Sequence, residues 1–250
     1  MARKNNIGRR PQGTPSTGRT RGTSAPILEG DDTLVDVVEV RDQGIDFFER
    51  NRTLILGIAV AFFVAVAAYF VYQTFVKIPA ERNAVEAMQQ AQVQFERDSF
   101  GLALTNPGGD GLGFLDIIDN YGGTKAGNLA NYYAAVSYLN LGNAEAALDY
   151  IKSFDADGKL LPPMKYGVLG DAEGELGNLD AAAAAYENAV DAAGENYLTA
   201  GYYLNKLALL RLHQDNKEEA LAAFRRLKTD FGNSPEAGTA DKYIAMLEMK

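Results

Sequence analysis

The hydrophobic pattern of the chain changes abruptly at Leu54, where a run of nineteen residues without a charged side chain begins. The run ends at Tyr72, and the apolar character continues to Val76. At about 1.5 Å per helical residue, this segment spans roughly 35 Å and exceeds the ~30 Å hydrocarbon core of a bilayer. A buried core helix is rarely uncharged for so long, and a cleaved signal peptide begins near residue one, whereas more than fifty residues precede this run. The pattern predicts one transmembrane signal-anchor helix at 54–76.

After this segment, small and large apolar residues recur with a period of 35 to 38 residues, set by turn signals at Gly142, Gly177 and Asp215. Each turn residue precedes an alanine by five positions, and a large apolar residue follows each alanine four positions later. This is typical of the tetratricopeptide repeat, whose amphipathic helix pairs stack because none can bury its apolar face alone. The sequence therefore predicts an all-α fold, with a single transmembrane helix followed by a tetratricopeptide-repeat α-solenoid. The alanines and their large partners are Ala147 and Ile151, Ala182 and Tyr186, and Ala220 and Phe224.

The same pattern predicts the helices and segments of the chain. One long helical stretch is expected over 44–98, with a break or kink near Pro79. Residues 80–121 are interpreted as a degenerate first repeat, and 100–111 as a long loop. The helices that follow are expected at 112–121, 126–141, 144–154, 164–176, 180–193, 197–213, 217–230 and 235–249. Three segments result: a disordered basic tail and linker at 1–43, a juxtamembrane and transmembrane segment at 44–78, and the repeat domain at 79–250.

Charge divides the chain in the same way. Residues 1–53 carry a net charge of +1, residues 54–76 carry none, and residues 77–250 carry −10, which together give the formal charge of −9. Six of the first 25 residues are Lys or Arg and none is acidic, so this tail either binds anionic lipid or rRNA or is only solvated. Nine Lys or Arg precede the span, which predicts a cytoplasmic N-terminus and residues 77–250 in the periplasm of a single-pass inner-membrane protein.

The composition excludes several kinds of chemistry. There is no Cys and a single His, so thiolate and multi-histidine metal sites, a cysteine nucleophile and a lipoprotein anchor are ruled out. The glycine-rich stretch 109–113 lacks the spacing of a phosphate loop, Asp155–Gly158 lacks the ligands of a calcium loop, and His213 is expected as a helix-end residue. We therefore predict no enzyme activity and no catalytic, cofactor or metal-binding residue. The negative charge of the chain also argues against nucleic acid as a partner.

The first helix of each repeat pair lines the groove of a tetratricopeptide stack, which identifies candidate binding residues. Their mixture of apolar and acidic side chains suits extended segments that are apolar or partly basic. The alternative is that several of them pack between repeats. The predicted groove residues are Tyr132, Val136, Leu139 and Asn140 in the first clear repeat, Asp171 and Glu175 in the second, and Asn205, Leu209 and Leu212 in the third.

The apolar segment carries a second candidate interface. Gly57, Ala61 and Ala65 recur every four residues, a spacing that lets two helices approach closely in lipid. They are predicted to form a packing face for a membrane partner. Gly and Ala are also common in transmembrane helices without such a role.

Several motifs surround the predicted span: Phe47-Phe48-Glu49-Arg50-Asn51 before it, Gly57 and Tyr72 within it, and the segment Ala84–Phe95 after it. With these motifs, residues 45–250 show a resemblance to the ancillary Sec-translocon subunit family of bacteria. The repeats and the run Phe231-Gly232-Asn233-Ser234-Pro235 add to it, while the basic tail, the loop at 100–111 and Glu173 depart from it.

The resemblance implies association with the Sec channel, with a membrane-anchored chaperone like a peptidyl-prolyl isomerase, and with newly exported client proteins. The function it implies is a chaperone-like protein-binding scaffold tethered to membrane lipid. Two alternatives stay open: a scaffold for another envelope assembly, such as cell division, secretion or outer-membrane biogenesis, and an enzyme or its regulator.

Overall fold

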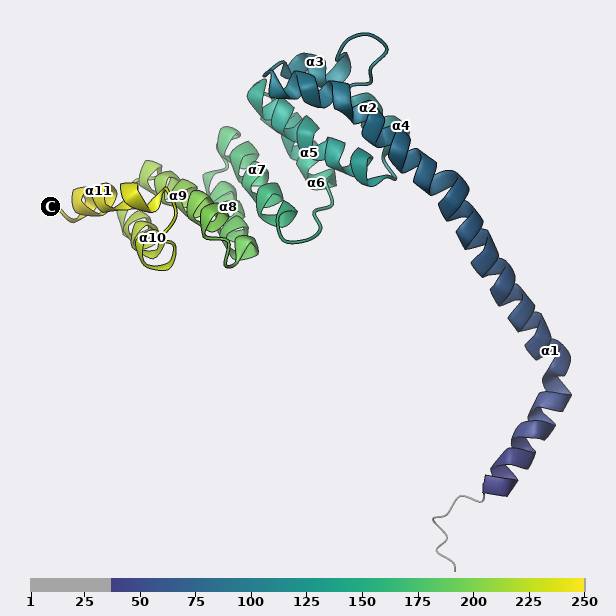
Figure 1. Ribbon diagram of the computed structural model, residues 1–250. Coiled ribbons are helices and arrows are strands. Elements are labelled where there is room, and N and C mark those ends of the chain that lie inside the picture. The colour runs from purple at the N-terminus through teal and green to yellow at the C-terminus, as the bar shows by residue number, and fades with distance from the viewer. Residues whose placement is uncertain (1–36, 250) are drawn as a thin grey trace, which may run out of the picture. The chain divides into compact units, whose positions relative to one another are not determined.

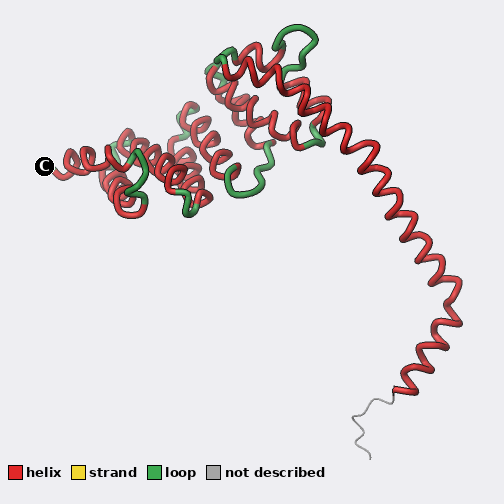
Figure 2. The backbone as a smooth tube through the Cα atoms, viewed as in Figure 1, coloured by secondary structure: helices red, strands yellow, loops and turns green. Residues whose placement is uncertain are grey.

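The computed structural model describes residues 37–249, with side chains from Phe47 onward. Residues 1–36 of the predicted tail and linker lie outside the described residues, whereas 37–43, predicted as linker, belong to the first helix. All regular elements in the described range are helices: eleven α-helices and one π-helical turn (Figures 1 and 2). The predicted all-α class is confirmed. The chain divides into two units, Met1–Phe63 and Val64–Lys250, with the division inside the first helix.

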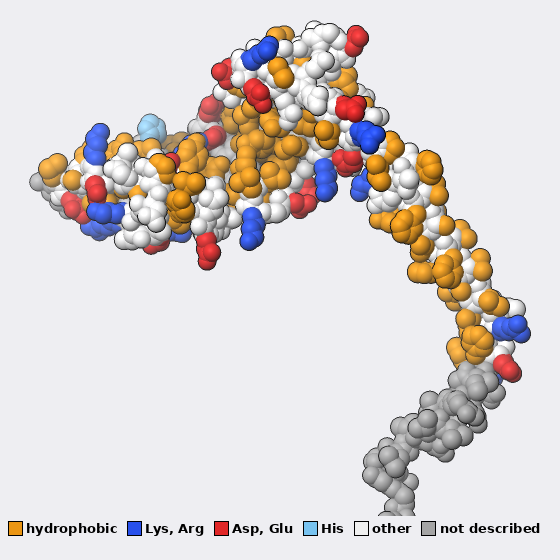
Figure 3. Space-filling view, in the orientation of Figure 1, with side chains coloured by type: hydrophobic (Ala, Val, Ile, Leu, Met, Phe, Trp, Pro, Cys, Tyr) orange, Lys and Arg blue, Asp and Glu red, His pale blue; other side chains and the backbone are white. Residues whose placement is uncertain are grey.

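Helix α1 (Val37–Tyr72) contains the apolar segment. Its best 18-residue window has a mean hydropathy of 2.7, and none of that window is buried. Apolar side chains cover the helix on the face that Figure 3 shows. Leaving so many large apolar side chains exposed to water is strongly unfavourable, at roughly 1.5–3 kcal/mol for each. Among the described residues, this is the one helix long and apolar enough to cross a membrane.

The helix continues past Tyr72 through a π-helical turn at Gln73–Lys77 into α2 (Ile78–Glu96). Pro79 has no N–H and its ring clashes with the carbonyl four residues earlier, so a regular α-helical ladder cannot pass this point. The Ile78 N–H instead donates to the Gln73 carbonyl, five residues back. The disturbance predicted near Pro79 is thus present as a widened turn, and the helix is not interrupted.

Six of the remaining helices, α5 to α10, form three antiparallel pairs. Helices α2, α3 and α4 precede the pairs α5/α6, α7/α8 and α9/α10, and α11 ends the stack (Figure 1). Their bounds are α3 Phe100–Thr105, α4 Phe114–Tyr121, α5 Lys125–Asn140, α6 Ala144–Ser153, α7 Leu161–Glu175, α8 Leu179–Ala193, α9 Tyr197–His213, α10 Lys217–Asp230 and α11 Ala237–Glu248.

One element corrects the sequence interpretation, because α3 occupies part of the expected loop at 100–111. Ala103 is fully buried and Leu104 nearly so, and both belong to the cluster that contains Ala84, Phe114 and Ala130. The six-residue helix is too short for its periodicity to be recognised, and burial of these two side chains stabilises it.

The turn signals of the repeats have a direct structural reason. Gly142 and Gly177 have φ values of +74° and +79°, and Asp215 takes the same left-handed conformation at +57°, which ends the first helix of each pair. Asn143 and Asn216 then cap the second helices, each side-chain oxygen accepting a hydrogen bond from the N–H three residues on. In the middle repeat Asn178 makes no such cap, and its side chain donates to Glu173 Oε2 at 2.8 Å instead.

The predicted small and large positions form the core. The three alanines Ala147, Ala182 and Ala220 are completely buried, and so are Ile151 and Phe224. Two large apolar clusters result, one over α2–α5 and one over α8–α11, with a smaller cluster around Phe154 between them.

Candidate protein-binding groove

A groove of about 670 Å³ crosses three consecutive repeats. Its walls come from the first helix of each pair, α5, α7 and α9, together with two residues of α8. Apolar side chains gather over α5, α6 and α7 in Figure 3. The lining residues are Tyr132, Val136, Leu139, Asn140, Val168, Asp171, Gly174, Glu175, Leu179, Tyr186, Tyr202, Tyr203, Lys206, Leu210 and His213.

The structure brings together the six groove residues predicted on α5 and α7. They are Tyr132, Val136, Leu139, Asn140, Asp171 and Glu175. Whether they bind a partner stays a prediction.

The three residues predicted on α9 lie outside the groove lining. Asn205 is partly buried with its Oδ1 enclosed, Leu209 is 37% exposed, and Leu212 packs against the C-terminal cluster. The predicted Asn205 and Leu209 follow Asp171 and Glu175 by 34 residues, whereas the lining residues Lys206 and Leu210 follow them by 35. A displacement of one residue turns a side chain by about 100° around the helix and out of the groove. The α9 residues that do line the groove are Tyr202, Tyr203, Lys206, Leu210 and His213.

A polar group, which we call the groove centre, consists of Asp171, Tyr186 and Lys206. The Tyr186 hydroxyl donates to Asp171 Oδ1 at 2.6 Å, and Lys206 Nζ donates to the same oxygen at 2.5 Å. Nζ also lies 5.5 Å from the ring centroid of Tyr186 and 5.3 Å from that of Tyr202. The carboxylate therefore orders a cation over two aromatic faces, a geometry that strengthens when water is partly excluded.

The pair is half-buried. The side chains of Lys206 and Asp171 are 28% and 32% exposed. Sequence analysis missed Lys206, although it follows Asp171 by 35 residues, one repeat length, which is the spacing that places two residues on adjacent first helices.

Burial raises the pKa of three groove tyrosines. Desolvation raises the pKa of Tyr186 far above its ordinary value of 10, with the hydrogen bond to Asp171 as the next cause. Desolvation likewise raises the pKa of Tyr203, followed by the effect of Tyr132, and raises that of Tyr132 itself. These hydroxyls remain neutral hydrogen-bond donors at physiological pH.

Two glycines of α7 make room for these rings. A Cβ on Gly167 would lie 2.2 Å from Tyr203 Cε1, and a Cβ on Gly170 would lie 2.6 Å from Tyr186 Cε1. The aromatic side chains therefore pack against the backbone of α7. Gly174 differs, because its added Cβ would meet only the Ala182 Cβ at 3.7 Å, an ordinary contact.

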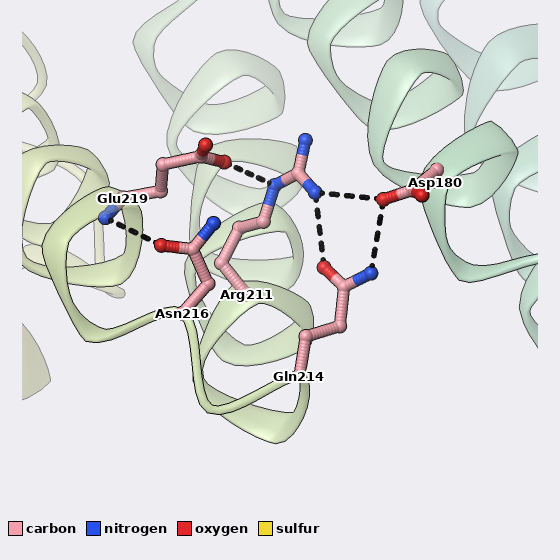
Figure 4. A network of polar contacts seen from close by, with 5 residues as sticks. All are labelled: Asp180, Arg211, Gln214, Asn216 and Glu219. Atoms are coloured by element: carbon pink, nitrogen blue, oxygen red, sulfur yellow. Dashed lines mark hydrogen bonds and ion pairs between the residues drawn. The ribbon is translucent and has the colours of Figure 1, made fainter.

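A second polar group joins the repeats where α8 begins, α9 ends and α10 begins; we call it the turn network (Figure 4). Arg211 Nη1 lies 3.2 Å from Asp180 Oδ1, and its Nε lies 2.8 Å from Glu219 Oε2. Gln214 accepts from Arg211 at 3.0 Å and donates to Asp180 at 3.1 Å. Asn216 caps α10 by accepting from the Glu219 N–H at 3.3 Å. These contacts fix the end of α9, where His213 lines the groove.

The candidate membrane interface lies on α1. Gly57, Ala61 and Ala65 are all exposed and four residues apart along this helix. Their role in helix packing stays a prediction.

Comparison with protein families finds a match to the tetratricopeptide repeat over residues 204–234, which covers most of α9 and all of α10. The chain contains a tetratricopeptide repeat. Neither the comparison with curated proteins nor that with solved structures finds a match. Together with the helix pairs, this match establishes an all-α tetratricopeptide solenoid, the architecture of a protein-interaction scaffold.

Proposed function

We propose that this chain is a membrane-tethered, non-enzymatic scaffold that binds segments of other proteins in its groove. More specifically, we propose an ancillary subunit of the Sec translocon, which helps newly exported chains in a chaperone-like way beside a membrane-anchored chaperone like a peptidyl-prolyl isomerase. The groove is the observation that carries the binding role, because it joins aromatic, aliphatic and charged side chains across three repeats.

The membrane role is supported by the uncharged part of α1, and the assignment to the Sec system by the resemblance described above. In this proposal α1 spans the inner membrane, the N-terminus is cytoplasmic and the repeats lie in the periplasm. The distribution of Lys and Arg supports that orientation.

Topology is tested with single introduced cysteines. The native chain has no Cys, so Thr17→Cys or Asp157→Cys creates one labelling site in the full-length protein. In intact cells whose outer membrane has been made permeable, a membrane-impermeant maleimide should label the cysteine at 157 and not the one at 17. The reverse pattern would overturn the orientation.

The partner assignment is tested by photo-crosslinking in cells from Leu139 and Leu210, which face the groove from α5 and α9. Positions Gly57 and Ala65 probe the membrane helix. Crosslinks to the Sec channel, the chaperone and exported proteins are expected. Crosslinks only to cell-division, secretion or outer-membrane machinery would replace the Sec assignment with the alternative scaffold.

A further inference from the structure

Lys206 occupies the groove centre in the way that a bound cation would. Its Nζ contacts the Asp171 carboxylate at 2.5 Å and lies over the rings of Tyr186 and Tyr202 at 5.5 and 5.3 Å. We infer that the groove centre is a receptor for a lysine or arginine side chain of an extended polypeptide segment, and that Lys206 fills the receptor until such a segment arrives. This inference rests on the proposed function, because it names the kind of segment that the groove takes.

The charges of the groove favour a basic side chain over an acidic one. Asp171 and Glu175 contribute two carboxylates, and Lys206 contributes one fixed positive charge. An acidic ligand group that reached Lys206 would also approach Asp171 and lie in the same groove as Glu175, where like charges repel. A basic ligand group that replaces Lys206 keeps Asp171 neutralised and gains the same aromatic faces.

The Tyr186 hydroxyl supports the binding of a cation at the groove centre. The Tyr186 hydroxyl is committed as a donor to Asp171, which holds the carboxylate in place whichever cation it pairs with. The hydroxyl is neutral at physiological pH, and burial raises the pKa of Tyr186 further, so it does not compete with Asp171 as an anion. The carboxylate is therefore held by α7 and α8, independently of Lys206, and Tyr202 of α9 supplies the second aromatic face.

Lys206 can leave without disturbing the fold. Its side chain is 28% exposed and has a flexible stem, whereas its neighbours Tyr203, Leu204 and Leu207 are buried and hold α9 in place. When a ligand displaces Lys206, its ammonium group moves into water, and one partly exposed ion pair with Asp171 is replaced by another. The free energies of the two arrangements are therefore nearly equal. Aliphatic neighbours of the incoming basic residue would contact Val136, Leu139 and Leu210, which line the same groove.

The experiment uses the full-length chain in detergent micelles and three fluorescent peptides of alternating serine and leucine. They differ only in the central residue, which is lysine, norleucine or glutamate. Binding is measured by fluorescence anisotropy for the wild type, Lys206→Met and Asp171→Asn. Lys152→Met and Asp149→Asn on α6 are matched controls, because both side chains are exposed and lie outside the groove lining.

The lysine peptide should bind the wild type most tightly. Lys206→Met removes the competing ammonium group. The variant should bind the lysine peptide about fivefold more tightly, the equivalent of roughly 1 kcal/mol. Asp171→Asn should remove the preference for lysine over norleucine, and the controls should match the wild type. A gain of affinity in Lys206→Met cannot arise from unfolding, and circular dichroism checks the fold of Asp171→Asn.

Weaker binding of the lysine peptide by Lys206→Met, or tightest binding of the glutamate peptide, would overturn the inference. Equal binding of the three peptides would also overturn it while leaving the groove as a protein-binding site. If no peptide binds although groove crosslinks persist in cells, the receptor is wrong and the proposed function stands. If no peptide binds and the groove gives no crosslinks in cells, both the receptor and the proposed function are wrong.

Discussion

The groove centre and the turn network join neighbouring repeats with the same kinds of groups, yet their surroundings differ. In the groove centre the paired side chains of Lys206 and Asp171 are about one-third exposed, and two aromatic rings lie beside the cation. In the turn network Arg211, which is 22% exposed, bridges two exposed carboxylates, Asp180 at 91% and Glu219 at 57%. The two regions therefore differ in the exposure of their carboxylates and not of their cations, and water screens the carboxylates of the turn network more strongly.

Because their exposure differs, the ion pairs of the two regions have different roles in the solenoid. An ion pair whose carboxylate is exposed, as at the helix turns, contributes little free energy and mainly keeps the turn geometry. A half-buried pair in an aromatic groove is more sensitive to the loss of either partner and offers a ligand a defined chemical environment. The predictions below set matched positions of the two regions against each other.

The largest effect is expected at Gly167, which lets Tyr203 form the wall of the groove. Gly167→Ala places a Cβ 2.2 Å from the ring and should cost about 1–3 kcal/mol through overpacking. Gly174→Ala on the same helix is the control and should stabilise the protein by up to about 1 kcal/mol, because alanine favours helix over glycine. Thermal unfolding of the full chain in detergent measures both, and equal effects would show that the ring does not pack on α7.

A smaller effect is expected from Asp171→Asn, which removes the charge that accepts hydrogen bonds from Tyr186 and Lys206. The loss should be about 1–2 kcal/mol in urea unfolding and should change little with salt. Asp180→Asn in the turn network should cost no more than about 0.5 kcal/mol and should lose its effect at high salt. If the two variants are equally destabilised and equally salt-sensitive, the two regions do not differ as described.

Alkaline pH gives a third comparison. Burial raises the pKa of Tyr186 above 10, so near pH 10 and above the unfolded chain releases this proton while the folded chain retains it. The stabilisation that the neutral Tyr186 hydroxyl gives the folded chain is complete below pH 10, and it is lost as the pH rises further. Tyr186→Phe should therefore make the fall of unfolding free energy between pH 10 and 11 shallower, whereas Tyr197→Phe, which replaces a tyrosine that is 46% exposed, should not. Identical slopes in wild type and Tyr186→Phe would contradict the burial of this hydroxyl.

A small effect is also expected from Arg211→Gln, which breaks the turn network at its centre (Figure 4). Unfolding free energy should fall by less than about 1 kcal/mol, and peptide binding in the groove should not change. A loss of groove binding at full helicity would show that the turn network controls the position of α9.

The sequence pattern was sufficient to predict the positions of the repeat helices, because local signals specify where these helices end. The left-handed Gly142 and Gly177, followed by asparagine, mark the turns directly, and Ala147, Ala182 and Ala220 occupy the buried positions expected of them. Helix α3 was missed because six residues show no periodicity, and its stability depends on tertiary burial of Ala103 and Leu104.

The predicted residues of α5 and α7 line the groove, whereas those predicted on α9 do not. The prediction on α9 used a period of 34 residues, which gives Asn205 from Asp171, whereas the stripe repeats after 35 residues at Lys206. An error of one residue is enough to leave the stripe, because each residue turns the helix by about 100°. The pairing of Lys206 with Asp171 was therefore within reach of the sequence, since the same 35-residue spacing separates Gly142 from Gly177.

The most direct test of the central claim, that the groove is the surface which receives other proteins, is photo-crosslinking yield in cells from the two regions. A crosslinking residue is introduced at Leu139 or Leu210 in the groove and at Asp180 or Gln214 in the turn network, all in the full-length chain. The groove positions should give strong crosslinks to partner proteins, reduced by Asp171→Asn, and the turn positions should give few. Equal yields in the two regions, or stronger crosslinks from the turn network, would contradict the claim.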